Sequence, residues 1–174
     1  MDYLTKPISR KSLRVIAKFF REIFCLPLDG KIDVISLLDE ICQTLDNVSY
    51  SVVDDNMLPA NIPACCQCDE TGVFTIYIKS SVYMGAWQNN VGGYRNHIMH
   101  EMCHVFLYKI GYTPILSRSF KNNEIAAYCS AEWQAKALCG EIMMPYEATK
   151  NLSAIEIASK FGVSIESAQI RKKY

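Results

Sequence analysis

Hydrophobic residues recur every three or four positions in several stretches of the chain, which is the spacing of one face of an α-helix. The clearest stripe contains Leu13, Phe20 and Phe24 and predicts a first helix over residues 9–24. A second helix is expected after Asp33, because aspartate is a favoured N-cap residue. Further helices are expected over residues 80–87, 94–110, 124–143 (with a cap at Asn122 or Asn123), 153–161 and 164–172.

Two stretches have the character of β-strands. Residues 73–79 place Phe74, Ile76 and Ile78 on one face, and residues 49–53 form a shorter candidate. Residues 54–70 contain two prolines and a cysteine cluster, so we expect a loop there. The pattern indicates an α+β fold that is mostly helical with a small sheet. We expect a main domain over residues 1–150 and a small C-terminal helical pair over residues 151–174, within one compact unit.

Length and charge limit the classes of function. The 174 residues suit one domain, and 18 basic against 18 acidic residues give a net charge of zero, which offers no electrostatic case for nucleic-acid binding. No stretch is long and apolar enough to span a membrane. Residues 1–21 lack the continuous apolar core of an export signal, so we expect a cytoplasmic protein.

The chain has eight cysteines, and in a reducing compartment most of them are expected to be buried thiols. Cys65 and Cys68 have the C-x-x-C spacing that could begin a second zinc site. No second C-x-x-C pair completes such a site. We therefore interpret Cys65, Cys66 and Cys68 as free thiols in a loop.

All three histidines lie between residues 97 and 104, and two of them belong to the string H-E-x-x-H at residues 100–104. On a helix, His100 and His104 project about 40° apart and can bind one metal ion, while Glu101 lies beside them as a base for a zinc-bound water. The alternative is a helix with two surface histidines. The helical context, which ends at Gly111, and the absence of histidine elsewhere favour the metal site.

A catalytic zinc ion usually takes three protein ligands. His97 is about 10.5 Å from His104 along the helix axis, too far to share the ion, so the third ligand is a carboxylate or a cysteine from elsewhere. Glu132 is the best candidate, because it is the only charge on the apolar stripe of its helix. Glu124 and Glu141 are weaker candidates near the two ends of that helix. A surface salt bridge is the alternative role of Glu132.

The two motifs together resemble the ImmA/IrrE family of zinc metallopeptidases. Members of that family read H-E-L-G-H and then E-x-x-A-x-x-F-A-x-x-L-L-M-P, and here residues 100–104 and 132–145 follow this order. The resemblance implies a zincin-like metallopeptidase domain with one Zn²⁺ ion held by His100, His104 and Glu132. This chain departs from the family at Cys103, where glycine is usual, and at Leu138-Cys139, where Phe-Ala is usual.

The resemblance implies a zinc-dependent endopeptidase, with Glu101 as the catalytic residue and a helix-turn-helix repressor of a phage or mobile element as the protein substrate. His97 and Tyr128 are candidates for a second oxyanion donor, although structural roles are favoured for both. An acidic or carbonyl group should hold the outer nitrogen of each ligand histidine. The alternatives are a non-catalytic zinc-containing regulatory module that binds a transcription factor, and a toxin-antitoxin or phage-defence component.

The two C-terminal helices have the spacing of a helix-turn-helix. A helix that reads DNA needs a basic face, and only Arg171, Lys172 and Lys173 cluster here. We therefore interpret the pair as a packing subdomain and do not expect direct binding to nucleic acid.

Overall fold

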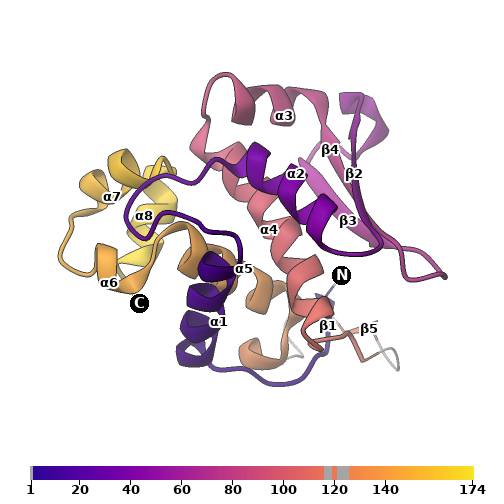
Figure 1. The fold of residues 1–174 in the computed structure, drawn as a ribbon, viewed down its shortest axis with the longest axis horizontal. Helices are drawn as coiled ribbons and strands as arrows, with labels where there is room; N and C mark the ends of the chain where they lie inside the picture. Colours follow the sequence, from indigo (N-terminus) through magenta and orange to yellow (C-terminus); the bar gives the residue numbers. More distant parts are fainter. Residues whose placement is uncertain (1, 116–118, 121–125) are drawn as a thin grey trace.

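The computed structural model describes residues 2–115, 119–120 and 126–174. Its architecture is α+β and mostly helical, as the sequence predicts (Figure 1). The α-helices are α1 (Arg10–Ile23), α2 (Val34–Thr44), α3 (Ser80–Trp87), α4 (Gly92–Lys109), α5 (Ala131–Met143), α6 (Tyr146–Thr149), α7 (Ala154–Phe161) and α8 (Ile165–Arg171). The strands are β1 (Asp2–Tyr3), β2 (Val48–Val53), β3 (Ala64–Cys68), β4 (Phe74–Lys79) and β5 (Ser119–Phe120), and two short 3-10 helices are η1 (Asp55–Met57) and η2 (Ala127–Cys129).

Helix α4 runs through the middle of the molecule, with the three-stranded sheet on one side and α1 and α5 on the other (Figure 1). Met99 and Met102 of this helix are fully buried. On the side of α1, the rings of Phe20 and Phe106 pack edge to face with centroids 4.8 Å apart. Because α4 is packed on both sides, its rotation about its own axis is fixed by the core.

Four of the predicted helices begin where the sequence indicates, because a side chain caps each first turn. Ser9 accepts a hydrogen bond from the backbone N–H of Ser12, and Asp33 accepts from two backbone N–H groups of α2. Ser153 forms a capping box with Glu156 at the start of α7, and Ser164 caps α8. Helix α3 also matches its predicted bounds, whereas α6 was not predicted.

The sheet has the strand order β2-β4-β3, with β2 parallel and β3 antiparallel to β4. Strand β3 corrects the prediction of a loop over residues 54–70. Its residues pair with those of β4, Cys66 opposite Ile76, so hydrogen bonds to β4 stabilise this segment as a strand. Strands β1 and β5 form a separate two-stranded pair.

Helix α5 begins at Ala131, seven residues later than predicted. Ser130 is its N-cap, with the side-chain oxygen accepting a hydrogen bond from the N–H of Trp133 at 2.9 Å. Residues 126–130 therefore lie before the helix, and Tyr128 belongs to η2. The predicted caps and Glu124 lie outside the described residues.

Helix α4 begins at Gly92, two residues earlier than predicted. A Cβ atom on Gly92 would lie 2.6 Å from the carbonyl carbon of Val163, so only glycine permits this close approach of the α7–α8 turn. One turn further on, the fully buried guanidinium of Arg95 donates hydrogen bonds to the carbonyl oxygens of Gly162 and Ile32. The start of α4 is thereby joined to two distant segments.

The two C-terminal helices pack on the rest of the chain through Phe161 and Ala168, which are both fully buried. The division of the chain near residue 150 stays a prediction. Among the helices in the described part of the chain, none combines the length and the apolar character that crossing a bilayer requires.

A buried ion cluster joins α1, α5 and α8. The Glu141 carboxylate lies 2.8 Å from a guanidinium nitrogen of Arg171, 3.3 Å from Arg14 and 3.5 Å from Arg10. The side chains of Glu141 and Arg171 are 1% and 3% exposed. Glu141, a weaker candidate for the third metal ligand, therefore compensates buried arginine charge instead. Arg171 points inward and is not available for a basic DNA-reading face.

We expect Glu141→Gln to lower the free energy of unfolding by about 3–5 kcal/mol, because it leaves the buried charge of Arg171 uncompensated. Chemical denaturation followed by circular dichroism measures this loss. The matched control is Glu147→Gln, which removes an exposed ion pair with Lys150 and should change stability by less than about 1 kcal/mol. Equal losses in the two variants would contradict the structural role of the cluster.

Candidate metal centre

His100 and His104 lie one turn apart on α4, and both direct their Nε2 atoms to the same point. The two Nε2 atoms are 3.1 Å apart, and the rings are nearly perpendicular with centroids 4.6 Å apart. Since packing on both sides fixes the rotation of α4, the direction of both imidazoles follows from the core. The helix predicted around the H-E-x-x-H string is confirmed.

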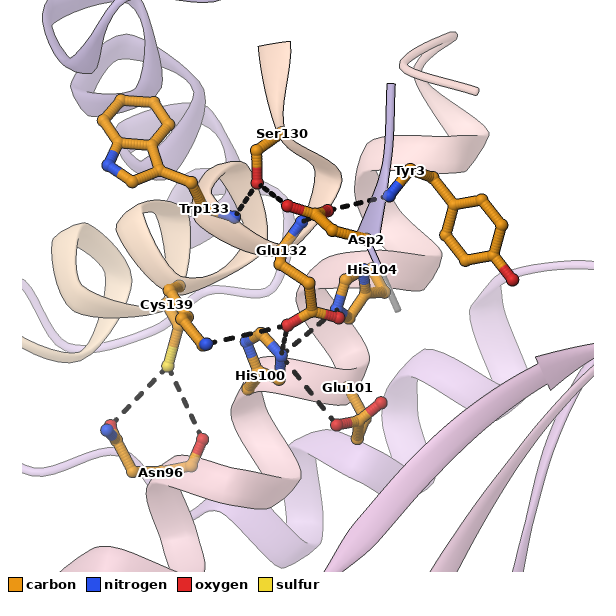
Figure 2. Close-up of polar contacts among 11 residues, drawn as sticks. Asp2, Tyr3, Asn96, His100, Glu101, His104, Ser130, Glu132, Trp133 and Cys139 are labelled. Atoms are coloured by element: carbon orange, nitrogen blue, oxygen red, sulfur yellow. Dashed lines mark hydrogen bonds and ion pairs between the residues drawn. The ribbon is translucent and has the colours of Figure 1, made fainter. Parts of the chain in front are cut away.

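Glu132 reaches this point from the first turn of α5 (Figure 2). Its two carboxylate oxygens lie 3.4 Å from Nε2 of His100 and 3.3 Å from Nε2 of His104. The metal-ligating atoms of the three residues all lie within 4.8 Å of one another, and no other group of this kind is found among the described residues. The structure thus brings together the three side chains that the sequence singled out, from two helices.

The apolar stripe around Glu132 predicts a buried carboxylate without a charged neighbour, but the structure shows a partly exposed carboxylate with a lysine beside it. The Glu132 side chain is 39% exposed, and Lys136, one turn along α5, lies 3.8 Å away. The pKa of Glu132 is held well below its usual range, first by hydrogen bonds from the two imidazoles. Glu132 is therefore ionised at neutral pH and is ready to bind a cation.

Burial lowers the pKa of His100, which keeps this imidazole neutral near pH 7, the form that binds metal. Its outer nitrogen, Nδ1, is buried and has no hydrogen-bond partner in the described part of the chain. The expected acidic or carbonyl group is therefore missing there among those residues.

Glu101 lies on the side of α4 that faces strand β3. Its carboxylate is 4.0 Å from Nε2 of His100, and the side chain is 13% exposed. Burial raises the pKa of Glu101 to about 7, and the negative charge of Glu132 adds a smaller increase. The charge of His104 and a hydrogen bond from the Cys66 backbone N–H lower this pKa, but by less. A carboxyl group with a pKa near neutrality is suited to both accepting and releasing a proton.

Asp2 is part of this region, and sequence reasoning missed it. It is only 5% exposed, and its carboxylate accepts hydrogen bonds from the backbone N–H of Glu132 at 3.1 Å and from the Ser130 hydroxyl at 2.5 Å (Figure 2). No periodic pattern or motif includes a residue so close to the N-terminus. Only the contacts that Asp2 makes in the folded chain reveal its role.

Neither candidate for a second oxyanion donor belongs to the metal-ligating group. His97 is exposed on α4, and Tyr128 is 55% exposed in η2. Both side chains lie outside the buried core, and the Tyr128 carbonyl accepts hydrogen bonds from the N–H of Ile8 and the Gln134 side chain.

All eight cysteines are free thiols, but only Cys103 and Cys139 are buried, so the expectation that most are buried is wrong. Cys103 and Cys139 contact each other between α4 and α5, and the Cys139 thiol lies 3.6 Å from the Asn96 carbonyl oxygen. The three clustered cysteines lie on β3 instead of in a loop, because their segment pairs with β4.

Comparisons with known proteins identify a family and a similar fold. A model of the family Peptidase_M78, described as the IrrE N-terminal-like domain, matches residues 79–173, more than half of the chain and all of α4 and α5. A solved structure of a Mycobacterium tuberculosis transcriptional regulator has the same fold, with a TM-score of 0.60 at 13% identity. The likeness covers 91% of this chain and 45% of that one, so this chain spans less than half of that protein. No curated protein matches the sequence significantly.

The raised pKa of Glu101 predicts a pH-dependent loss of stability in the metal-free protein. The unfolded chain releases this proton near the ordinary value of 4.5, whereas the folded chain holds it up to about 7. Stability should therefore fall as pH rises between these values, by up to roughly 3 kcal/mol. Denaturation of the chelator-treated protein at pH 5 and pH 8 measures this change.

Glu101→Gln should remove this part of the pH dependence and make the metal-free protein more stable at pH 8. Glu40→Gln, at an exposed position, is the control and should leave the pH dependence as it is. A wild-type protein whose stability does not fall over this range would show that Glu101 ionises normally.

Proposed function

We propose that this chain, which belongs to the IrrE N-terminal-like peptidase family, is a zinc-dependent endopeptidase. The observation that carries the proposal is the convergence of His100, His104 and Glu132 within 4.8 Å, with Glu101 beside them. A purely structural metal site needs no adjacent acid or base. A carboxyl group whose pKa lies near neutrality at this position supports a catalytic centre.

The donor set fits zinc. Two imidazole nitrogens and one carboxylate are a combination that catalytic zinc sites use, and three protein ligands leave a fourth position open. His100, His104 and Glu132 would hold the ion. Zinc bound there would supply a Lewis acid that polarises the scissile carbonyl group and lowers the pKa of water to about 7.

Glu101 is the residue that moves the proton. Its carboxylate accepts a proton from the attacking water as the water oxygen adds to the carbonyl carbon. The same carboxyl group then donates this proton to the amide nitrogen as the C–N bond breaks. Its burial supports this role, because burial raises the pKa of Glu101 and makes its carboxylate a stronger base toward the water proton than a carboxylate with an ordinary pKa.

The edge of the sheet suggests how a peptide substrate is held. Strand β3 pairs with β4 alone among the described strands, so its other edge is unpaired. The backbone N–H of Cys66 on β3 interacts with the Glu101 carboxylate, so this edge runs beside the reacting groups. We propose that the substrate binds as an extended strand along β3, which would bring a backbone carbonyl to the metal centre.

For the substrate itself we propose a helix-turn-helix transcriptional repressor, as the family resemblance implies. The solved structure with this fold is named a transcriptional regulator, which supports a role connected with transcription. The same name favours the second candidate function, a non-catalytic module that binds a transcription factor. The two candidates differ in whether Glu101 is needed. The C-terminal helix pair gives no support to direct DNA binding, since Arg171 is turned into the core.

Glu101→Gln tests the catalytic proposal. We expect this variant to keep about one zinc ion per chain, because it retains all three ligands, and to lose about 10²–10⁴-fold in kcat, the range for a general acid–base. Zinc content is measured by elemental analysis, and cleavage by mass spectrometry on a candidate repressor from a neighbouring gene. Glu132→Ala is the companion variant and should lose the zinc.

Cleavage that persists in Glu101→Gln would contradict the assigned role of Glu101. Unimpaired repressor binding without cleavage, in both wild type and Glu101→Gln, would favour the binding module instead. A wild-type protein that takes up no zinc would exclude both the peptidase and the zinc-containing module.

A further inference from the structure

The N-terminal segment of the chain lies along the start of α5, the helix that carries Glu132. Strand β1 pairs with β5, and an isolated bridge joins Leu4 to Ser130. Further hydrogen bonds run from the N–H of Thr5 to the carbonyl of Cys129 (2.8 Å), from the N–H of Ile8 to the carbonyl of Tyr128 (2.9 Å), and from the Gln134 side chain to the carbonyl of Lys6 (2.7 Å). The position of this helix start therefore depends on residues 2–8.

Asp2 makes the most direct of these contacts. One oxygen of its buried carboxylate accepts hydrogen bonds from the N–H groups of Glu132 and Tyr3, and the other accepts from the Ser130 hydroxyl (Figure 2). The first N–H groups of a helix have no partner within the helix, and its N-terminus attracts negative charge. Asp2 supplies both an acceptor and a charge at this point, in addition to the cap provided by Ser130.

We infer that Asp2 is a positioning residue for the metal ligand Glu132, an inference that rests on the proposed metal centre. Asp2 fixes the backbone N–H of the same residue whose side chain reaches the two histidines. The Glu132 side chain is partly exposed, so packing alone does not hold it. A shift of the first turn of α5 would move the carboxylate away from the Nε2 atoms of His100 and His104, which α4 holds still.

Asp2 lies 130 residues from Glu132 in sequence and outside the residues 79–173 that match the family model. Partners that orient a metal ligand typically change metal affinity by about 10–100-fold when they are removed. Asp2 should therefore affect metal binding without touching the metal.

The test compares zinc dissociation constants of purified wild type, Asp2→Ala and Asp2→Asn, measured by competition with a chelator well below their melting temperatures. We expect Asp2→Ala to bind zinc about 10–100-fold more weakly. Asparagine has nearly the same volume as aspartate and keeps one acceptor oxygen. Asp2→Asn should therefore fold even if Asp2→Ala does not, and it should lose less zinc affinity than Asp2→Ala. The absorption spectrum of the Co²⁺-loaded protein gives a second readout, which changes if the coordination geometry changes.

Asp33→Ala is the matched control. Asp33 caps α2 through two backbone N–H groups, so its removal destabilises the protein in a similar way without affecting α5. This control should melt at a lower temperature yet bind zinc within about twofold of wild type. Wild-type zinc affinity and an unchanged Co²⁺ spectrum in both Asp2 variants would overturn the inference while leaving the proposed function intact. Failure of the wild type itself to bind zinc would overturn both.

Discussion

The structure depends on the burial of helix α4 between the sheet and the helices α1 and α5. This burial supplies the apolar contact that holds the two halves of the core together, and it also fixes which way every side chain on the helix points. Met99 and Met102 face the core, and as a result His100 and His104 are directed toward Glu132 on α5. The direction of the two histidines is thus a by-product of hydrophobic packing, whereas Glu132 is held by the polar contacts at the start of α5.

Buried polar groups fix the relative positions of helices and strands that hydrophobic contacts alone do not determine. Arg95 joins the start of α4 to the turn before α8, Glu141 joins α5 to α1 and α8, and Asp2 joins the N-terminal strand to α5. Each of these groups contacts partners far away in sequence, since a buried charge without a partner would be strongly unfavourable. Packing is tolerant of small slips between elements, whereas these hydrogen bonds are directional. They therefore define the register of the helices.

Features with a local cause could be predicted from the sequence. The caps at Ser9, Asp33 and Ser153 depend on residues within one turn, and the H-E-x-x-H helix depends on its own spacing. Strand β3 was missed because its strand character comes from pairing with β4, and the start of α5 was misplaced because Ser130 and Asp2 stop the helix there. Glu132 was found by its place in an apolar stripe, although the structure shows it partly exposed. No sequence pattern links Asp2 or Arg95 to their partners.

The long range of the polar contacts has a consequence for the order of folding. The bonds of Asp2 and of Arg14 to α5 span 130 and 127 residues, and that of Arg95 to Gly162 spans 67. Such contacts close large loops, and chains dominated by them fold slowly. During synthesis the histidines leave the ribosome well before the turn that receives Arg95. The hydrogen bond from the N–H of Glu132 to Asp2 can form only when the chain has closed a loop of 130 residues, so the start of α5 is held in full only once the two ends of that loop have met.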